Sequence, residues 1–434
     1  MKKYILIILC CLTSFPLWSY NVNMIVEHYS VDQGLPNNTV NCTLKDRDGF
    51  IWFGTWYGLC CFDGVKFKTF NKQEHDSDVP PRKIQRIVED KNGYIWVKTI
   101  DRKLYVFNKV TECFHAVYDD MKNYSENIQV IKLQNTAEGD VLLLTKDKNL
   151  LLAGVDEKGQ VTIKILFDSR NEINKHDYTL KHHVLCETEE YISWIGTDYK
   201  VAAVHKGSEL ASRPADFITS KINSGDKDSF TSFFEDGRKV WVGDRAGIFY
   251  SIDVRTGLVN RYVLSEIKGA ISNLLVTPAG YVYLSVAGQG TYEYDLAERR
   301  LQKINTEMND AMVTHAFIDQ YDKIWFHENE KALIYYDPLN HTAKRFPFTM
   351  FGKITTLYSE DAGERGLFFL SPAGEAWLFD REHAEMVYIN KLKQLSNDRA
   401  NQQFYHLMLD NDGVLWLSSA DEGVYCMNFP KKQF

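Results

Sequence analysis

The feature that most constrains this fold is an internal repeat of about 45 residues. Each copy holds a polar turn, a short strand pattern around a large apolar or aromatic residue, a second turn and another apolar strand pattern. These central residues lie 42 to 52 residues apart and are Trp52, Trp96, Leu142, Trp194, Trp241, Tyr283, Trp325, Phe368 and Trp416. A period in this range indicates a repeat architecture, in which each copy is one supersecondary unit.

Each copy predicts four short strands. In the first copy the expected strands are residues 40–45, 50–54, 59–63 and 65–70, with Asp, Asn and Gly in the turns between them. One sheet of this size cannot bury both of its faces, but sheets stacked face to face around a channel can. The sequence therefore predicts an all-β fold, a β-propeller of about nine four-stranded blade units. The central residue of each copy is expected to pack between neighbouring blades.

The arrangement of the units is less constrained than their number. Residues 24–31 have the character of an outer strand that closes a ring, whereas residues 429–434 look like the start of a second strand for the same edge. Propellers usually have four to eight blades. We therefore expect one seven-bladed ring plus two blades of a second, incomplete ring, with a single eight- or nine-bladed ring as the alternative. Two unpaired blades would expose sheet edges that invite a partner or aggregation.

The first twenty residues predict export. Lys2 and Lys3 precede an apolar run that ends in small residues, which is typical of a secretory signal peptide, with a lipoprotein signal as the alternative. We expect residues 1–20 to be the signal peptide, residues 21–434 to be the propeller region, and the protein to be periplasmic. No later stretch has the 18 or more consecutive apolar residues of a membrane span.

Charge and motif content disfavour several classes of function. The formal net charge is −8, and loss of the two N-terminal lysines would make it about −10, so we expect no binding of nucleic acid. The six later cysteines lie in expected strands without a CxxC pair, so we expect most of them in the core. The turn at residues 46–49 is followed by Phe50 where a calcium loop needs another oxygen ligand, and we expect a tight Asx turn there. We expect no metal site, no cofactor and no catalytic residue, because HExxH, GxSxG and Walker sequences are all missing.

The first copy carries a resemblance to a known family. The resemblance rests on Gly34-Leu35-Pro36, Asp48-Gly49, Ile51-Trp52-Phe53-Gly54-Thr55, Gly58-Leu59 and Phe62-Asp63-Gly64. With these features, residues 29–70 resemble two-component regulator propeller repeats, as found in the periplasmic sensor region of Bacteroidetes hybrid two-component systems. Later copies are more degenerate, but the period extends the resemblance to essentially the whole mature chain.

This resemblance implies a non-catalytic sensor module that binds oligosaccharides. Family members generally continue with a second propeller, a membrane helix and a histidine kinase, and none of these is recognisable in the sequence. The expected partners are therefore an oligosaccharide ligand, a second propeller or a membrane histidine kinase that carries the signalling half, and a second copy of this chain. The alternatives are a protein-interaction scaffold or truncated sensor fragment, and a propeller polysaccharide lyase or glycosidase.

Strand parity places the candidate site. In a four-stranded up-and-down blade, the second turn and the long connection to the next blade emerge on the same face, and the connections vary most in length. Aromatic rings stack on sugars, and Arg pairs with sulfate or uronate. The candidate ligand-binding residues in the second turns are Trp56, Tyr57, Arg102, Tyr199 and Arg245.

The same turns bear on the enzyme alternative. A glycosidase or lyase would need an acid and a base that converge at the channel mouth. The carboxylates at these turns are Asp101, Asp198, Asp244 and Asp421. They recur at equivalent places in successive copies, which favours a structural role over a catalytic one.

Overall fold

The computed structural model describes residues 25–70, 80–122, 129–168, 180–188, 190–196, 201–207, 230–304, 313–329, 331–351, 358–361, 363, 366–371, 374–391 and 404–428. The expected signal peptide at residues 1–20 and the expected competing strand at residues 429–434 lie outside them. Helices among the described residues are short: α1 (Tyr118–Met121), η1 (Val31–Gln33) and η2 (Phe348–Phe351). No described helix has the length and apolar character needed to cross a membrane.

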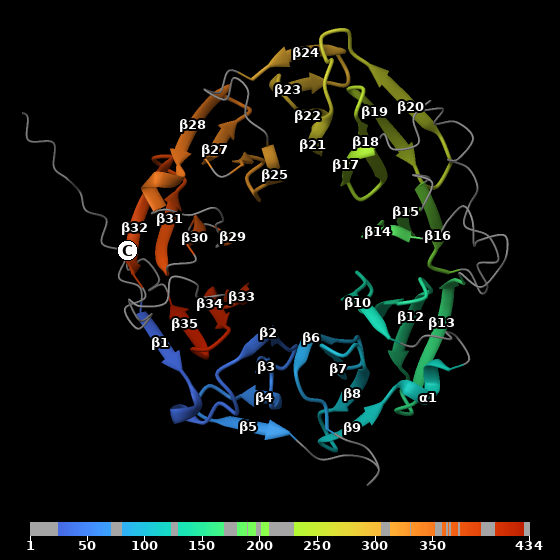
Figure 1. The fold of residues 1–434 in the computed structure, drawn as a ribbon, viewed down its shortest axis with the longest axis vertical. Coiled ribbons are helices and arrows are strands. Elements are labelled where there is room, and N and C mark those ends of the chain that lie inside the picture. The colour runs from blue at the N-terminus through green and yellow to red at the C-terminus, as the bar shows by residue number, and fades with distance from the viewer. Residues whose placement is uncertain are drawn as a thin grey trace, which may run out of the picture.

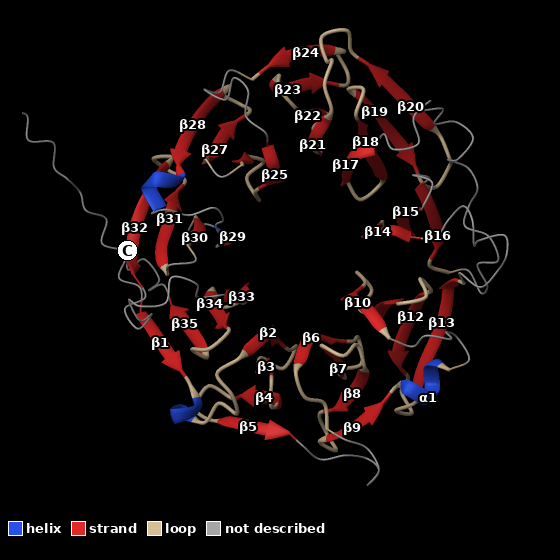
Figure 2. Cartoon of the chain, in the orientation of Figure 1, coloured by secondary structure: helices blue, strands red, loops and turns tan. Residues whose placement is uncertain are grey.

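Strands account for nearly all of the regular structure, as Figure 2 shows. In chain order they are β1 (Ile25–Tyr29), β2 (Val40–Lys45), β3 (Ile51–Thr55), β4 (Gly58–Phe62), β5 (Phe67–Phe70), β6 (Ile84–Glu89), β7 (Ile95–Thr99), β8 (Leu104–Asn108), β9 (Cys113–Ala116), β10 (Val130–Asn135), β11 (Val141–Thr145), β12 (Leu150–Val155), β13 (Val161–Phe167), β14 (Leu180–Glu187), β15 (Tyr191–Gly196), β16 (Val201–His205), β17 (Phe230–Glu235), β18 (Lys239–Asp244), β19 (Ile248–Asp253), β20 (Val259–Val263), β21 (Ile271–Val276), β22 (Tyr281–Val286), β23 (Gly290–Asp295), β24 (Arg300–Lys303), β25 (Val313–Ile318), β26 (Ile324–Glu328), β27 (Ala332–Asp337), β28 (Thr342–Pro347), β29 (Tyr358–Asp361), β30 (Leu367–Leu370), β31 (Glu375–Asp380), β32 (Glu385–Lys391), β33 (Phe404–Leu409), β34 (Val414–Ser419) and β35 (Val424–Asn428).

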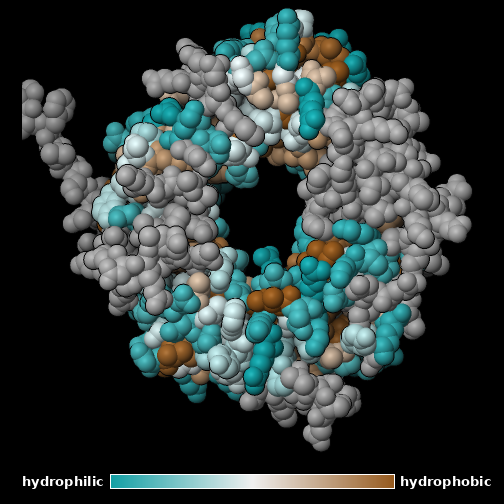
Figure 3. Space-filling view, in the orientation of Figure 1, coloured by the Kyte–Doolittle hydropathy of each residue, from teal (hydrophilic) through white to brown (hydrophobic). Residues whose placement is uncertain are grey.

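These strands form nine antiparallel sheets, one for each copy of the repeat. Among the described residues eight sheets have four strands, and the sheet of β14 to β16 has three. We number the units along the chain, so that β2 to β5 form the first unit and β33 to β35 together with β1 form the ninth. Figure 1 shows the sheets standing side by side around a channel, with the first strand of each unit innermost. The space-filling view shows this channel open at its centre (Figure 3).

The ring is closed by the pairing of β1 with β35. Five residue pairs form this antiparallel ladder, from Ile25 opposite Asn428 to Tyr29 opposite Val424. Gly423 precedes β35 with φ +84, and a Cβ there would lie 2.2 Å from the Tyr29 carbonyl oxygen. Only glycine therefore lets the backbone of β1 approach so closely. The first strand of the chain thus completes the last sheet.

This closure corrects one expectation. The all-β propeller of nine units and the role of residues 24–31 as a closing outer strand are confirmed. The expected seven-bladed ring with two extra blades is wrong, because all nine sheets stand in one ring and β1 occupies the edge of β35. The expectation relied on the usual blade number. The sequence of one blade does not fix that number, because the angle between blades depends on the side chains packed between them.

The central residues of the nine copies are buried, as the sequence predicts. Each lies on the second strand of its unit, and none is more than 5% exposed. Trp52, for example, packs in one cluster with Ile84, Ile95 and Phe107 of the next unit. The layers between neighbouring sheets are therefore the hydrophobic core.

An Asp in the first turn fixes the orientation of the central Trp in five described units. In the first unit, Asp46 Oδ1 accepts the backbone N–H groups of Asp48 and Phe50 at 3.0 and 2.9 Å, which is the expected Asx turn. Its Oδ2 accepts the indole N–H of Trp52 at 2.8 Å. The same indole bond, at 2.7 to 3.2 Å, joins Asp90 to Trp96, Asp236 to Trp241, Asp319 to Trp325 and Asp410 to Trp416. One side chain therefore shapes the turn and also satisfies the buried indole.

A testable consequence concerns Gly54, where the second unit packs against β3. A Cβ at Gly54 would lie 2.4 Å from Cys42 Sγ and 2.6 Å from Ile84 Cγ2. We expect Gly54→Ala to lower the free energy of unfolding by about 1–3 kcal/mol, because it overpacks the layer between the two blades. Gly154→Ala is the control, since its Cβ would have its nearest neighbour at 3.6 Å. Equal urea midpoints for the two variants would contradict this packing argument.

Candidate functional site

The turns divide the ring into two faces. The first and third turns of each unit emerge on what we call the staple face, and the second turns and the connections between units emerge on the loop face. On the staple face, cations that follow the third strand pair with carboxylates of the preceding unit. These pairs are Lys109 with Asp46 at 3.1 Å, Lys206 with Glu138 at 3.0 Å and Arg381 with Asp319 at 2.5 Å. The charges of these pairs hold neighbouring units together.

Backbone hydrogen bonds join neighbouring units on the loop face. The Lys83 N–H donates to the Trp56 carbonyl at 3.0 Å, and the Ile100 N–H donates to the Lys83 carbonyl at 2.9 Å. The Val130 N–H donates in turn to the Arg102 carbonyl at 2.9 Å. Trp56, Lys83 and Arg102 therefore lie next to one another on the loop face of the first and second units. Their side chains provide one aromatic ring and two cations.

The structure brings together some of the predicted site residues and separates others. Trp56 and Tyr57 are 43% and 61% exposed in the second turn of the first unit, and Lys83 Nζ lies 5.3 Å from the centre of the Trp56 ring. Arg102 is half-buried in the second turn of the adjacent second unit. Arg245 is exposed in the fifth unit, which Figure 1 places across the channel. Tyr199 lies outside the described residues. The site that the geometry supports therefore spans the first and second units.

Asp244 and Asp101 bind groups of their own second turns, and Asp421 is exposed in the second turn of the ninth unit. Asp244 Oδ1 accepts the N–H groups of Ala246 and Ile248 at 2.9 and 2.8 Å. Asp101 accepts a hydrogen bond from the Thr99 hydroxyl and lies 3.5 Å from Lys103 Nζ. Both carboxylates therefore have partners in their own turns, and Asp198 lies outside the described residues.

Sequence reasoning missed two cations beside Arg102. In the register of β6 and β7, Arg86 lies directly opposite Lys98. Side chains in such positions have Cβ atoms about 4.5–5.5 Å apart, and like charges there destabilise a sheet. Within the described part of the chain neither Arg86 nor Arg102 has an ion pair. We call Arg86, Lys98 and Arg102 the basic cluster.

Lys98 is the buried member of this cluster. Its side chain is 6% exposed, and its Nζ donates to Gln85 Oε1 at 2.6 Å. Burial, followed by the charges of Arg102 and Arg86, lowers the pKa of Lys98 from 10.5 to about 8. An anion in contact with the ammonium group would reverse this effect. Burial and the two neighbouring cations therefore all disfavour the charged form of Lys98.

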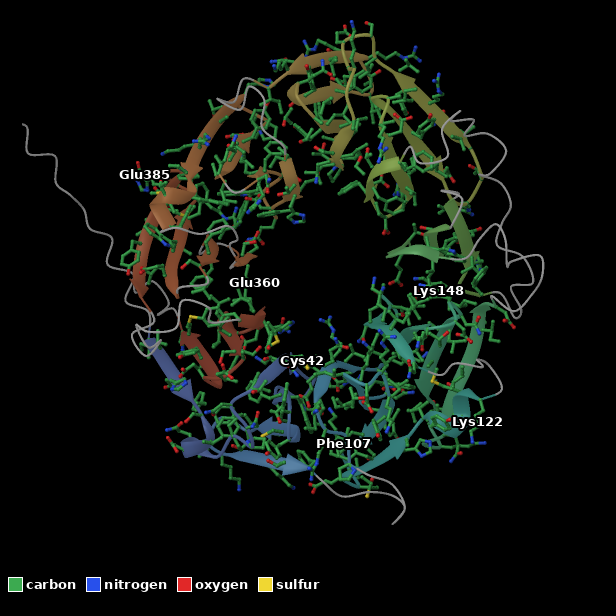
Figure 4. The ribbon with its side chains drawn as sticks, viewed as in Figure 1. Cys42, Phe107, Lys122, Lys148, Glu360 and Glu385 are labelled. Carbon is green, nitrogen blue, oxygen red and sulfur yellow. The ribbon has the colours of Figure 1, made fainter. Side chains whose placement is uncertain are left out.

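Arg86 also acts on the first strands of the neighbouring units. The pKa of His406 on β33 is lowered to about 4 by burial and then by the charge of Arg86. Arg86 also opposes the rise that burial produces in the pKa of the Cys42 thiol on β2. Figure 4 labels Cys42 on the inner side of the ring, and Figure 1 shows β6, which carries Arg86, as the innermost strand of the second unit. Arg86 therefore lies at the channel wall where the ninth, first and second units meet, with Lys98 opposite it and Arg102 in the turn that follows β7.

Arg102 has a left-handed backbone conformation, as Lys148 has with φ +71 at the same place in the third unit. The φ of Arg102 is +68, in the left-handed region that favours glycine. The residue three positions earlier, Thr99, accepts the N–H of Lys103, as Asp244 accepts the N–H of Ile248 in the fifth unit. Arg102 therefore corresponds to Gly247, with φ +82. The left-handed conformation costs a residue with a Cβ roughly 1–2 kcal/mol, and strain of this kind clusters at functional sites.

Carboxylates converge on the staple face, but a lysine is already bound among them. Oxygens of Asp46, Asp48 and Glu89 lie close enough together to hold a metal ion. Lys109 Nζ lies 3.1, 2.6 and 2.8 Å from these three groups. The positive charge at this cluster is therefore supplied by the protein itself.

Two hollows lie between units on the outer part of the ring. A groove of about 840 Å³ between the first and second units has an aromatic lining that includes Phe50 and Phe70. A cation on its rim, Lys68, is already paired with Glu112 at 2.5 Å. A smaller cavity of about 220 Å³ between the second and third units is lined by residues that include Cys113, His115 and Asp120. The loop face differs from both hollows because it combines exposed aromatic rings with cations that have no carboxylate partner among the described residues.

Comparison with known proteins supports the resemblance seen in the sequence. A family model described as the two component regulator propeller matches residues 34–57, which confirms that resemblance in the first copy. The chain is similar to the extracellular domain of a protein described as a one component system from B. thetaiotaomicron. The identity is 14% and the TM-score 0.38, covering 91% of this chain and 65% of that one. A search of curated proteins found no match.

Two further solved structures are similar over most of the chain. One is the extracellular domain of a protein described as a hybrid two component system from B. thetaiotaomicron, with 14% identity and a TM-score of 0.36, covering 94% of this chain and 59% of that one. The other is virginiamycin B lyase from Staphylococcus aureus, with 8% identity and a TM-score of 0.35, covering 93% of this chain and 99% of that one. The chain thus spans less than two thirds of the length of both extracellular domains.

The lowered pKa of Lys98 predicts a pH-dependent contribution to stability. Between pH 8 and 10.5 the unfolded state binds a proton at this lysine that the folded state has released, so stability rises with pH across that window. We expect Lys98→Met to be more stable than the wild type at pH 7 and to lose part of this rise. Urea unfolding at pH 7 and pH 10 measures both effects, with Lys66→Met at an exposed position as the control. A Lys98→Met variant that is less stable at pH 7, with an unchanged pH slope, would show that the ammonium is not under electrostatic strain.

Proposed function

We propose that this chain is a non-catalytic ligand-sensing propeller module that is exported to the periplasm and binds an oligosaccharide on its loop face. The observation that carries the proposal is the pair of exposed rings, Trp56 and Tyr57, beside cations without carboxylate partners. An aromatic ring stacks on the apolar face of a sugar, and neighbouring polar groups bind its hydroxyls. The closed ring gives these groups a rigid support, so little ordering of the scaffold is required on binding.

The repeat family supports a role in signal transduction. The first copy matches the two component regulator propeller model, and we propose that the module serves a two-component regulator of polysaccharide use. Its partners in this role would be a second propeller, a membrane histidine kinase or a second copy of this chain. Ligand binding would then act by favouring one arrangement of these partners over another.

Two observations support a binding function over a catalytic one. Asp101 and Asp244, at the second turns of the second and fifth units, are engaged by their own turns. Apart from Asp101, which is bound by Thr99 and Lys103, the side chains we assign to the site are aromatic or cationic, which suits recognition of a sugar better than acid–base chemistry on it.

The experiment that tests this proposal compares two exposed aromatic residues on opposite faces. Trp56 on the loop face and Phe50 on the staple face are each 43% exposed. We expect one class of oligosaccharide in a panel of plant and host glycans to raise the melting temperature of the wild type. Trp56→Ala should weaken that binding by roughly tenfold or more, as expected for loss of a stacking contact, whereas Phe50→Ala should leave it unchanged.

Three outcomes of this screen would count against the proposal. The first is a panel in which no glycan changes the melting temperature, which favours a scaffold. The second is equal loss of binding in both variants, which places the sugar elsewhere. The third is release of shortened products from a bound glycan, which would show an enzyme.

A further inference from the structure

The basic cluster requires a negatively charged partner, which an uncharged sugar does not supply. We propose that Arg86, Lys98 and Arg102 form an anion site at the channel wall, which holds a carboxylate or sulfate group of the ligand. The inference deepens the proposed function and rests on it for the claim that the anion is carried by a sugar. The anion site itself is argued from the geometry of the second unit.

The positions of Arg86 and Lys98 are occupied by uncharged residues in several other units. A register shift in the first strand recurs around the ring, and the pair that follows it in the second unit is Arg86 with Lys98. The same pair is Cys42 with Gly54, Ser232 with Gly243 and Asn273 with Ser285 in the first, fifth and sixth units. The fold therefore does not need charge at this position. Two cations placed opposite each other weaken the sheet unless a negative group lies between or beside them.

The backbone conformation of Arg102 also supports an anion site, independently of the strand pairing. In the fifth unit a glycine occupies the corresponding position, where a positive φ carries no strain, whereas the third unit places a cation there too, Lys148 with φ +71. Arg102 accepts the strain of φ +68 and brings a third guanidinium or ammonium group to the same wall. The carboxylate of its own turn, Asp101, is held by Thr99 and Lys103. Arg102 is therefore free to pair with a group from outside the chain.

The hydrogen-bond donors of the basic cluster fit a carboxylate or a sulfate. A guanidinium presents a planar fork of donors that matches the two oxygens of a carboxylate or sulfate, and a buried ammonium adds a point charge. The chain as a whole carries a formal net charge of −8, so its overall field repels anions and only a local cluster can hold one. The backbone bonds from Trp56 through Lys83 to Ile100 connect the stacking ring to this cluster. An acidic sugar could therefore stack on Trp56 and extend its charged group toward Arg102.

The test uses inorganic sulfate first, because it probes the anion site without any sugar. Melting temperatures are measured against sulfate concentration at constant ionic strength, maintained with sodium chloride, for the wild type and three variants. Arg86→Gln and Arg102→Gly remove cations of the cluster. Arg245→Gln removes an exposed arginine on the same face across the channel and is the matched control.

We expect sulfate to stabilise the wild type and Arg245→Gln along a saturable curve. Arg86→Gln and Arg102→Gly should raise the half-saturating concentration about tenfold or more, since each removes a charge-assisted contact. Arg102→Gly should also keep or raise the melting temperature without sulfate, because it relieves the left-handed strain; a merely structural Arg102 would lower it. A linear rise that is equal in all four proteins is the general salting effect of sulfate and would overturn the anion site.

Binding of three sugars then tests the anion site and the proposed function separately. Galacturonate carries a carboxylate, galactose 6-sulfate carries a sulfate, and galactose carries neither. Saturable binding of one or both charged sugars, lost in Arg86→Gln, supports the inference and identifies the anion. Sulfate binding without any sugar binding supports the anion site and contradicts the oligosaccharide proposal. Galactose could instead bind as tightly as both charged sugars, with no change in Arg86→Gln. This outcome supports the oligosaccharide proposal and overturns the anion site.

Discussion

The pairing of β1 with β35 is the constraint on which the rest of the structure depends. It joins residues about 400 positions apart, and it gives the sheet of β33 to β35 its fourth strand. Without it, the layer between the ninth and first units would open, and Trp416 would lose its packing against Phe53 and Phe62. Closure also removes the sheet edges that an open array would expose. The channel, the two faces and the proximity of the ninth, first and second units all follow from this one strand pair.

The two faces of the ring use charge in opposite ways. On the staple face, Lys109, Lys206 and Arg381 reach back to carboxylates of the preceding unit, so charge there serves stability. Near the channel wall of the second unit, Arg86 and Lys98 face each other and Lys98 titrates well below its ordinary range. Lys98 donates to Gln85, but the described residues give this pair of cations no carboxylate, and this is the observation behind the proposed anion site. This contrast is the reason we propose the loop face, and not the groove between the first and second units, as the ligand site.

The sequence predicts the strands and turns of each unit better than it predicts which residues of different strands and units lie close together. The central residues and the Asx turns could be predicted because each depends on a few adjacent residues and a fixed strand period. The Arg86 and Lys98 pair could not, because the register shift between Ile84 and Arg86 places two residues opposite one, and counting residues does not reveal where this occurs. Arg245 was grouped with Arg102 because their turns are equivalent, but the distance between equivalent turns depends on the number of blades in the ring. The site therefore required the closed ring to be known.

The most direct measurement tests closure through a native cysteine. Glu27 on β1 lies directly opposite Cys426 on β35, and the Cys426 thiol has no disulfide partner in the described chain. Opposed positions of an antiparallel pair bring the Cβ atoms near disulfide distance. In the Glu27→Cys variant, oxidation should produce an intramolecular disulfide between positions 27 and 426, found by mass spectrometry of non-reduced peptides from monomeric protein, whereas Glu27→Ser should give none. A thiol at position 27 that stays free, or that links only to a second chain, would contradict a single ring closed by its own first strand.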